Sequence, residues 1–219
     1  IEARLAAQVL RRRWIEVFDW GPSEVESVVA SLDGLRIRII EVGRTLAIRD
    51  VLTAVADAEG EAPVMVFDYL QGYARRQEAG DRRLAVGGLS DELNTWARET
   101  RSVSLVLSSV SRAFYHGNSE RTALDFLGSG KESGEVEFDA RGVFFLDAEP
   151  CPPDGTAPAR LHIAKSTFGG AGTTIGLKFH GALGIFEEDE NSLLTDEQKD
   201  VLQAVANGAS SVEEVAKGI

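Results

Sequence analysis

Residues 64–71, with the sequence Val-Met-Val-Phe-Asp-Tyr-Leu-Gln, constrain the fold of this chain more than any other stretch. The uninterrupted apolar run at 64–67 is typical of a parallel strand that is covered on both faces. Asp68 follows directly, so its carboxylate is expected at the carboxyl end of that strand, where α/β sheets bind ligands. In nucleotide hydrolases of the P-loop type, such an aspartate holds the metal ion that bridges the terminal phosphates. The alternative interpretation is an ordinary buried strand that closes in a capped turn.

Length and composition predict a globular α/β protein. The chain has 219 residues, of which 43% are hydrophobic and 7% aromatic, enough for one substantial core and a small appendage. No apolar stretch approaches the roughly 20 residues that a membrane-spanning helix needs, and no export signal opens the chain, so a cytoplasmic location without a membrane partner is expected. Cys151 is the single cysteine, which excludes an intrachain disulfide and a cysteine metal cluster. His116, His162 and His180 lack metal-ligand spacing and are interpreted as surface or strand residues.

The net charge of −12 limits the contacts that this protein can make with nucleic acid. Nonspecific binding depends on Lys and Arg side chains that neutralise phosphates, so any such contact is expected to be local. Part of the acidity is concentrated in residues 187–200, a charge run that we interpret as a solvated linker and a helix start.

Apolar periodicity predicts helices that alternate with strands in the first half of the chain, the pattern of a mostly parallel sheet flanked by helices. Shorter connections in the second half favour antiparallel closing strands. The expected helices cover residues 1–17, 23–32, 46–58 and 84–101, and the expected strands cover residues 36–42, 64–67, 103–108, 143–147, 160–165, 173–179 and 184–186.

The remaining segments are interpreted as loops and a tail. Residues 72–83 form a polar loop, and residues 110–141 form a loop long enough to be functional. A small helical tail follows residue 190. The chain starts at Ile1, within a helical pattern and without a methionine, so the sequence is interpreted as a fragment.

Four segments, in chain order, resemble the motor domain of DnaB-type replicative DNA helicases, a RecA-like family of hexameric ATPases. Residues 66–71 resemble the metal-aspartate strand of that family, including its Asp-Tyr-Leu-Gln ending. Residues 107–112 (Leu-Ser-Ser-Val-Ser-Arg) resemble the end of the next strand. Residues 131–140, which begin with Lys-Glu-Ser-Gly, resemble the loop and helix before the following strand, and residues 164–173 resemble a hairpin that reaches the neighbouring subunit.

The resemblance implies an N-terminally truncated RecA-like ATPase core over about residues 1–188. This fold is an α/β fold with a mostly parallel sheet flanked by helices and with antiparallel C-terminal strands. Residues 189–219 remain as an acidic linker and a partial helical tail. That tail resembles the first half of a winged-helix module, and the alternative is a terminal helical pair that packs on the motor.

The resemblance also implies the cofactors ATP and Mg²⁺ and a set of nucleotide-site residues. Asp68 matches the aspartate that coordinates Mg²⁺. Arg4 lies where the family often has an arginine that reaches the phosphates of its own subunit, although a solvent-facing helix arginine is the alternative. Lys165 matches a lysine that projects toward the γ-phosphate of the neighbouring subunit and would stabilise charge there, the alternative being a solvated lysine at a strand end.

Three departures from the family pattern weaken the expected catalysis. Ser109 stands where the family usually has a glutamine that senses the γ-phosphate, and its shorter hydroxyl has less reach. Thr167 stands where the family has a trans-acting arginine, a residue worth a factor of roughly 10³ to 10⁵ in rate. The phosphate-binding loop and the general-base glutamate would lie before Ile1. We therefore expect the isolated chain to be inactive in ATP hydrolysis.

For DNA, the resemblance implies that single strands are held in the central pore of a ring. Lys131, Glu132 and Gly134 match the contacting loop, where a bare glycine N–H can approach a phosphate closely. Arg75 and Arg76 belong to a second candidate loop, for which solvated surface charge is the alternative. Neither loop offers an aromatic platform, so backbone tracking is favoured over base stacking.

Together these features predict part of an ATP-dependent hexameric DNA helicase that translocates on single-stranded DNA. A homo-hexamer is expected, with a primase or a helicase loader as possible partners. One alternative is a degenerate RecA-like subunit that binds DNA or partners without hydrolysis. Another is a RecA-like recombination or regulatory ATPase, in which the same sheet serves a different polymer.

Overall fold

A computed structural model gives the structure of the chain as two compact units. The first unit combines Ile1–Ile37, Leu146–His162 and Thr174–Ile219, and the second combines Arg38–Phe145 and Ile163–Thr173. The structure describes residues 5, 7, 8, 10–32, 37, 39–41, 47–59, 64–75, 82–110, 126, 134–194, 198, 199 and 203.

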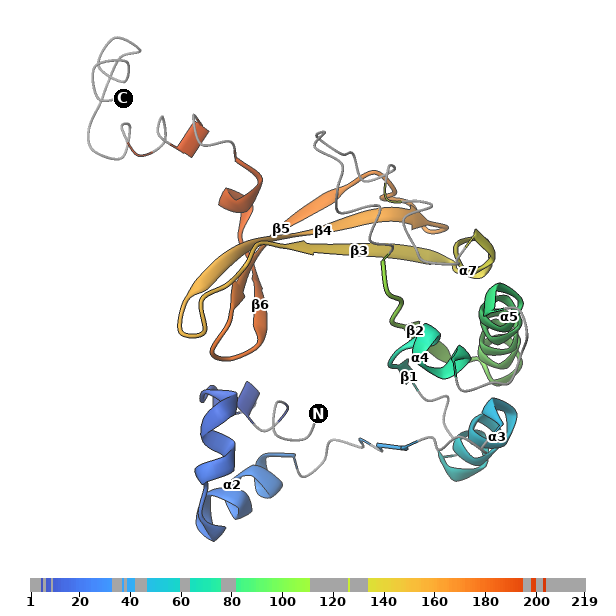
Figure 1. Cartoon of the computed structure of the whole chain (residues 1–219), viewed down its shortest axis with the longest axis horizontal. Coiled ribbons are helices and arrows are strands. Elements are labelled where there is room, and N and C mark those ends of the chain that lie inside the picture. Colours follow the sequence, from blue (N-terminus) through green and yellow to red (C-terminus); the bar gives the residue numbers. More distant parts are fainter. Residues whose placement is uncertain are drawn as a thin grey trace. The chain divides into compact units, whose positions relative to one another are not determined.

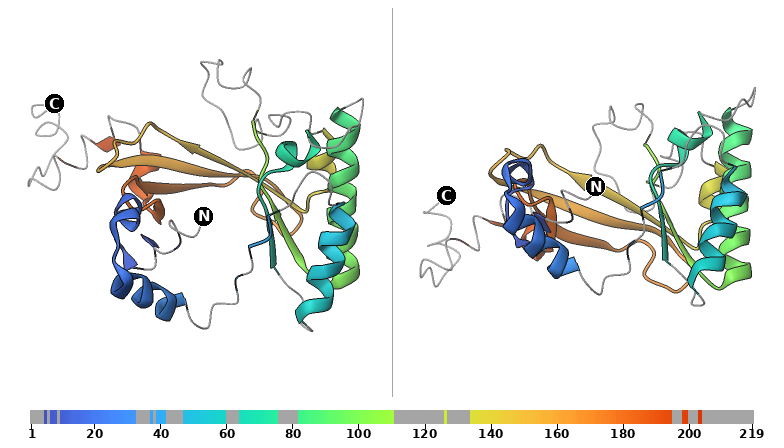
Figure 2. Two further views of the ribbon diagram at one scale, coloured as in Figure 1. Left: turned by 60° about the horizontal axis from the view of Figure 1, so that its bottom comes forward. Right: turned by 90° about the horizontal axis from the view of Figure 1, so that it is seen from below.

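The second unit contains the parallel strands that the sequence predicts. Strand β1 (Val64–Phe67) pairs in parallel with β2 (Val103–Val106), with Val64 opposite Val103 and Phe67 opposite Val106. The connection between them passes through helices α4 (Leu70–Ala74) and α5 (Arg82–Thr100). Helix α3 (Ile48–Glu59) lies beside α5 (Figures 1 and 2). The strand-helix-strand crossover, the central step of the fold prediction, is therefore confirmed.

The hydrophobic core of this unit lies between the helices and one face of the strand pair. Tyr73, which is 7% exposed, packs its ring at 73° to that of Phe67. The indole Nε1 of Trp96 donates to the carbonyl oxygen of Leu52 at 3.1 Å, which satisfies the one polar group of that buried side chain. The core residues are Ile48, Leu52, Leu70, Tyr73, Ala74, Val86, Leu89, Leu93 and Trp96, with Met65, Phe67 and Val106 packed against them.

The opposite face of the strand pair is exposed. Val64 and Val66 on β1 are 69% and 60% exposed, and their partners Val103 and Leu105 on β2 are 59% and 50% exposed. The apolar run predicts coverage on both faces, whereas the described residues cover one. A continuous apolar run indicates that both faces of a strand favour burial, but it does not indicate which segment of the protein covers them.

An antiparallel sheet forms the other main element of the structure. Its strands β3 (Gly142–Ala148), β4 (Thr156–Ser166), β5 (Thr174–His180) and β6 (Ile185–Glu188) follow chain order across the sheet. Strands β4 and β5 pair antiparallel with Thr156 opposite His180, and β5 pairs antiparallel with β6. Short turns join the strands, as the sequence predicts for closing strands. Helix α7 (Gly134–Asp139) precedes β3.

The N-terminal part of the first unit departs from the predicted helix over residues 1–17. The last described helical residue is Leu10, Arg11 lies in a turn with a positive φ of 49°, and a 3₁₀ helix, η1 (Trp14–Asp19), follows. The Trp14 N–H donates to the carbonyl oxygen of Ala182 at 3.2 Å, and Gln8 Nε2 donates to that of Gly184 at 2.8 Å. These bonds attach the segment to the β5–β6 turn, a tertiary contact that local periodicity does not reveal.

Helix α2 (Pro22–Leu32) confirms the second predicted helix but begins one residue earlier. The Glu24 carboxylate accepts a hydrogen bond from the Gly21 N–H at 2.7 Å, so the capping box is shifted toward the N-terminus from the predicted Ser23. Pro22 occupies the first helical position, where its missing N–H costs nothing.

The remaining predictions concern the strand expected at 36–42 and the segment that follows β6. The predicted strand at 36–42 is absent from its described residues, 37 and 39–41. The short 3₁₀ helix η3 (Glu190–Leu193) follows β6, and Asp189 caps it by accepting from the Asn191 N–H at 3.1 Å. Beyond residue 194 only residues 198, 199 and 203 are described, and all are helical, so most of the predicted tail lies outside the described residues. The domain boundary expected at 188 stays a prediction.

Every helix in the described ranges is too short or too polar to span a bilayer.

Candidate functional site

Asp68 lies where the sequence predicts, directly after β1 at the carboxyl end of the parallel strand pair. Its side chain is exposed. The Asp68–Tyr69 peptide bond is cis, and helix α4 begins at Leu70. A carboxylate at this place is open to a ligand while its backbone is held between a strand and a helix.

Ser109 lies at the same edge of the sheet because hydrogen bonds continue past the ends of both strands. The Leu107 N–H donates to the Phe67 carbonyl oxygen at 2.9 Å, and the Leu70 N–H donates to the Leu107 carbonyl oxygen at 2.9 Å. The segment after β2 therefore runs alongside Asp68 and the start of α4. Of the predicted nucleotide-site residues, the structure brings Asp68 and Ser109 to one edge.

Gln71 is a residue of this edge that the sequence reasoning did not single out. It is fully buried in the first turn of α4. Its Oε1 accepts from the Ser109 N–H at 2.9 Å, and its Nε2 donates to Ser108 Oγ at 2.7 Å. A buried amide left without partners costs roughly 1–3 kcal/mol, so such side chains are usually hydrogen-bonded. The glutamine that ends the Asp-Tyr-Leu-Gln motif was the available signal.

Lys165, near the end of β4, is bonded within its own chain. Its ammonium donates to the carbonyl oxygens of Glu137 at 2.7 Å and Phe138 at 2.9 Å, in the last turn of α7. The ammonium also lies 6.0 Å from the centroid of the Phe138 ring. A cation is favourable at the carboxyl end of a helix, where carbonyl oxygens lack partners. Its expected reach toward a neighbouring subunit stays a prediction.

The segment after Lys165 is also joined to the short connection between α7 and β3. The Thr167 N–H donates to the Arg141 carbonyl oxygen at 2.9 Å. The turn that follows contains Gly169 and Gly170, whose φ angles of 97° and 79° favour glycine. Phe168 is 85% exposed in this turn. The structure thus gives the predicted hairpin a fixed base and an exposed aromatic side chain at its tip.

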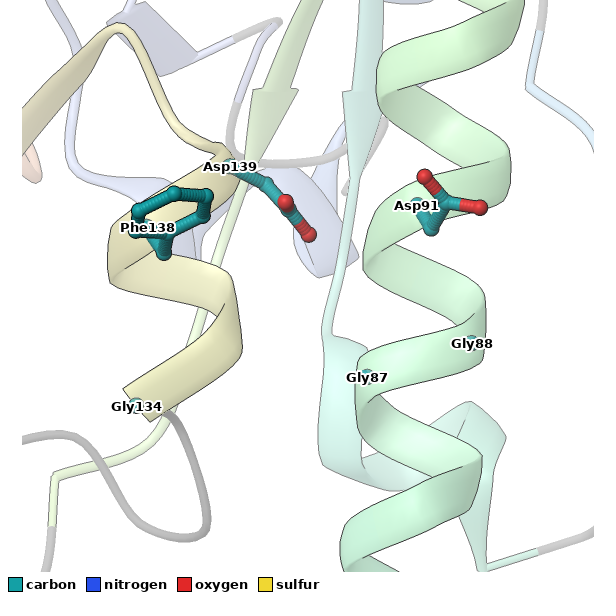
Figure 3. Close-up of a pocket in the computed structure, with 6 residues that line it drawn as sticks. All are labelled: Gly87, Gly88, Asp91, Gly134, Phe138 and Asp139. Carbon is teal, nitrogen blue, oxygen red and sulfur yellow. The ribbon is translucent and has the colours of Figure 1, made fainter.

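Gly134, the described residue of the predicted DNA-contacting set 131–134, is the first residue of α7. It lines an open pocket of about 500 Å³ between α5 and α7 (Figure 3). Figure 3 shows Phe138 and Asp139 on α7, across from Asp91 on α5. The pocket is lined by Gly87, Gly88, Asp91, Gly134, Phe138 and Asp139. Two carboxylates make it unfavourable for phosphate.

The other predicted site residues are less well defined. Arg75 follows α4, and its side chain is exposed. Arg4, Arg76, Lys131 and Glu132 lie outside the described residues. Within the described ranges, no three His, Cys, Asp or Glu side chains gather in a way that would hold a metal ion.

The imidazole of His162 on β4 has a pKa that its surroundings perturb. Burial lowers its pKa from the ordinary value of 6.5, the charge of Asp147 opposes this shift, and the charge of Arg160 adds to it. The ring Nδ1 and Thr174 Oγ1 share a hydrogen bond of 2.9 Å. A neutral imidazole in the antiparallel sheet is consistent with the strand role predicted from sequence.

The fold and the site define a class of protein. Parallel strands joined by helices, with a carboxylate at their carboxyl edge, are the arrangement of α/β proteins that bind ligands at that edge. The family model for the DnaB-like helicase C terminal domain matches residues 2–188. The chain belongs to this family, as the sequence motifs predict.

Solved structures agree with this placement at the level of fold. A DnaB-like replicative helicase, solved in a study of its interactions with primase, is 21% identical with a TM-score of 0.66, and the match covers 84% of this chain and 46% of that one. An ATPase domain is 20% identical with a TM-score of 0.67, and the match covers 86% of this chain and 70% of that one. The chain thus spans under half the length of the first structure. A comparison with curated protein sequences gave no match.

Proposed function

We propose that this chain is part of an ATP-dependent DNA helicase motor with a RecA-like core. In this proposal Mg²⁺-ATP binds at the carboxyl edge of the β1–β2 pair, and subunits of a ring move along single-stranded DNA. The observation that carries the proposal is the exposed carboxylate of Asp68 at that edge, beside residues 107–109, which follow β2.

The residues at the edge fit a metal-bound triphosphate in part. Asp68 would hold Mg²⁺, a hard cation that prefers carboxylate oxygens and usually keeps several waters. Bound ATP would supply the phosphoanhydride bond and its free energy of hydrolysis. Ser109 would face the terminal phosphate with a short hydroxyl. Arg4 would contact phosphates within its own subunit.

Lys165 would act across a subunit boundary, and this requires a change of partners. In the single chain its ammonium is bonded to the carbonyl oxygens of Glu137 and Phe138. A phosphate of the neighbouring subunit would have to compete with these two bonds. A triphosphate carries several negative charges, whereas a carbonyl oxygen carries only a partial one, so the Coulombic attraction of the ammonium would favour the phosphate.

For DNA, the proposal places Lys131, Glu132 and Gly134 on the path of a single strand, with Arg75 and Arg76 as a second lining. The carboxylates of Asp91 and Asp139 would repel phosphates, so the strand would pass outside the pocket between α5 and α7. Six copies of each loop would add up in a homo-hexameric ring.

Partners of the parent protein are also proposed. The replicative helicase in the structural comparison was solved in a study of its interactions with primase. We propose primase as a partner on this ground, and a helicase loader on the family resemblance alone.

A second candidate function is a degenerate subunit that binds nucleotide, DNA or a partner without hydrolysis. The residues that favour it are Ser109 and Thr167, at positions where a longer amide and a guanidinium are expected from the family pattern. Threonine carries no charge and makes no bidentate contact with phosphate. ATP-driven translocation on single strands would separate the two functions.

The proposal is tested by equilibrium binding of a fluorescent ATP analogue to the full chain, with Mg²⁺ or with a chelator. We expect binding that requires Mg²⁺ and that Asp68→Asn weakens at least tenfold, about the effect of one lost charge-assisted contact. Glu99→Gln is the matched control, since Glu99 is an exposed acid at the far end of α5. Binding that survives both the chelator and Asp68→Asn would refute a metal role for this carboxylate.

A further inference from the structure

Gln71 joins the two halves of the candidate site. Its position in the chain is three residues after Asp68, and its hydrogen-bond partners follow β2. The side chain is fully buried, yet it is an amide, which is uncommon among core residues. A side chain of this kind has a specific set of partners, because burial without them is unfavourable.

The two bonds fix the orientation of the amide. The Ser109 N–H is a donor and has to face the oxygen, Oε1, so the nitrogen Nε2 has to face Ser108 Oγ. A flipped amide would place two donors against each other at Ser109. Only one orientation of the Gln71 amide therefore accepts a hydrogen bond from the Ser109 N–H.

The two hydrogen bonds of Gln71 lie beyond the last paired residues of β1 and β2. Strand pairing ends with Phe67 opposite Val106, and the bonds at Leu107 continue it by one step. From Ser108 the segment has left β2, and the Gln71 amide bonds it to α4, while Val110 beyond it packs against the core cluster that contains Phe145 and Ala164. The position of Ser109 relative to Asp68 thus depends on this side chain.

We infer that Gln71 is a positioning residue that sets Ser109 against the metal-binding carboxylate and thereby lets the site distinguish a nucleoside triphosphate from a diphosphate. This inference rests on the proposed function. Asp68 would hold the Mg²⁺ that accompanies both nucleotides, whereas Ser109 would face the terminal phosphate that only the triphosphate carries. A shift of the Ser109 backbone would therefore change triphosphate binding more than diphosphate binding.

The variants for the test separate positioning from general stability. Gln71→Leu removes both bonds at similar volume, and Gln71→Glu keeps an acceptor for the Ser109 N–H while it loses the donor to Ser108. Thr100→Val is the matched control. The Thr100 hydroxyl is 2.7 Å from the Trp96 carbonyl oxygen and 2.8 Å from Ser102 Oγ, at the other end of β2.

The first readout needs no ligand. Amide hydrogen exchange at Ser109, followed by NMR on the full chain, should be about tenfold faster in Gln71→Leu than in the wild type, as expected for the loss of one protecting bond. Thr100→Val should leave Ser109 protected, and Gln71→Glu should restore much of the protection. Unchanged exchange in Gln71→Leu would overturn the inference, because Ser109 would then be held by something else.

The second readout is the ratio of the dissociation constants for Mg²⁺-ADP and Mg²⁺-ATP. We expect the wild type and Thr100→Val to prefer ATP equally and Gln71→Leu to lose about tenfold of that preference. A preference that Gln71→Leu retains, or that the wild type lacks, would overturn the inference. If the wild type binds neither nucleotide, the proposed function fails for this chain, and the exchange result still decides whether Gln71 holds Ser109.

Discussion

Lys165 caps the carboxyl end of helix α7 through Glu137, whose carbonyl oxygen accepts from the lysine ammonium at 2.7 Å. The same ammonium donates to the next carbonyl oxygen, that of Phe138, at 2.9 Å. A lysine that the family pattern assigns to a neighbouring nucleotide thus stabilises its own subunit in the single chain. If the proposed function holds, a phosphate would compete with these two bonds, and the base of the hairpin would then respond to bound nucleotide.

The cap predicts a measurable loss of stability. Lys165→Met should lower the free energy of unfolding by about 1 kcal/mol, since bonds to charged groups are worth more but this side chain is only half-buried. Urea unfolding of the full chain measures the change. Lys178→Met is the control: its ammonium is 3.7 Å from the Asp189 carboxylate, a long contact in a partly exposed pair, and its removal should cost less than about 0.5 kcal/mol. Equal costs for the two variants would contradict the capping role.

The two faces of the strand pair predict opposite responses to substitution. Leu70, the first residue of α4, is fully buried in the core that covers one face of the strand pair, so Leu70→Ala should destabilise the chain by about 2–5 kcal/mol. Val66 is 60% exposed, so Val66→Thr should cost under about 0.5 kcal/mol. Both changes are measured by urea unfolding. A large cost at Val66 would show that the exposed face is covered in solution.

Stability should fall as His162 becomes protonated. Its pKa in the folded chain is below the ordinary value of 6.5 because burial disfavours the charged form, so the unfolded chain binds more protons in the window below that value. The free energy of unfolding should therefore be constant above about pH 7.5 and decline as pH falls through 6.5. The decline should be smaller in His162→Gln, which keeps a polar group near Thr174. Parallel pH profiles for the two proteins would contradict the assignment.

The predicted DNA loop can be tested by its salt dependence. In an assembled ring, Lys131→Ala should weaken single-strand affinity and flatten the dependence of affinity on salt, because fewer phosphate counterions are released. Binding titrations of a fluorescent oligonucleotide at several salt concentrations measure both quantities. Lys178→Ala, on β5, is the control and should change neither. An unchanged slope in Lys131→Ala would remove the loop from the DNA path.

The sequence predicts the parts of this structure that local patterns encode. The strand at 64–67 and the place of Asp68 after it are as expected, because strand formation and direction follow from consecutive residues. The expected coverage of both faces is not found among the described residues, because it depends on segments elsewhere in the chain. The role of Gln71 was missed, since its partners Ser108 and Ser109 are far along the chain and no local periodicity records such a bond. The break at Arg11 was missed for the same reason.

Some site predictions depend on a second molecule and not on this fold. The reach of Lys165 toward a phosphate needs a neighbouring subunit, and its bonds to α7 show which contacts it makes otherwise. Periodicity and motif spacing within one chain give no information on contacts between subunits. The family pattern supplied the expectation, and an assembled complex would test it.

The central claim is that Asp68 binds a metal ion at the edge of the parallel strands, and paramagnetic NMR tests it most directly. Mn²⁺ would replace Mg²⁺, and Mn²⁺-ATP would be titrated into the isotope-labelled full chain. We expect selective broadening of the amides at 68–71 and 107–109, and loss of that broadening in Asp68→Asn. Broadening confined to the acidic stretch at 187–190, or unaffected by Asp68→Asn, would contradict it.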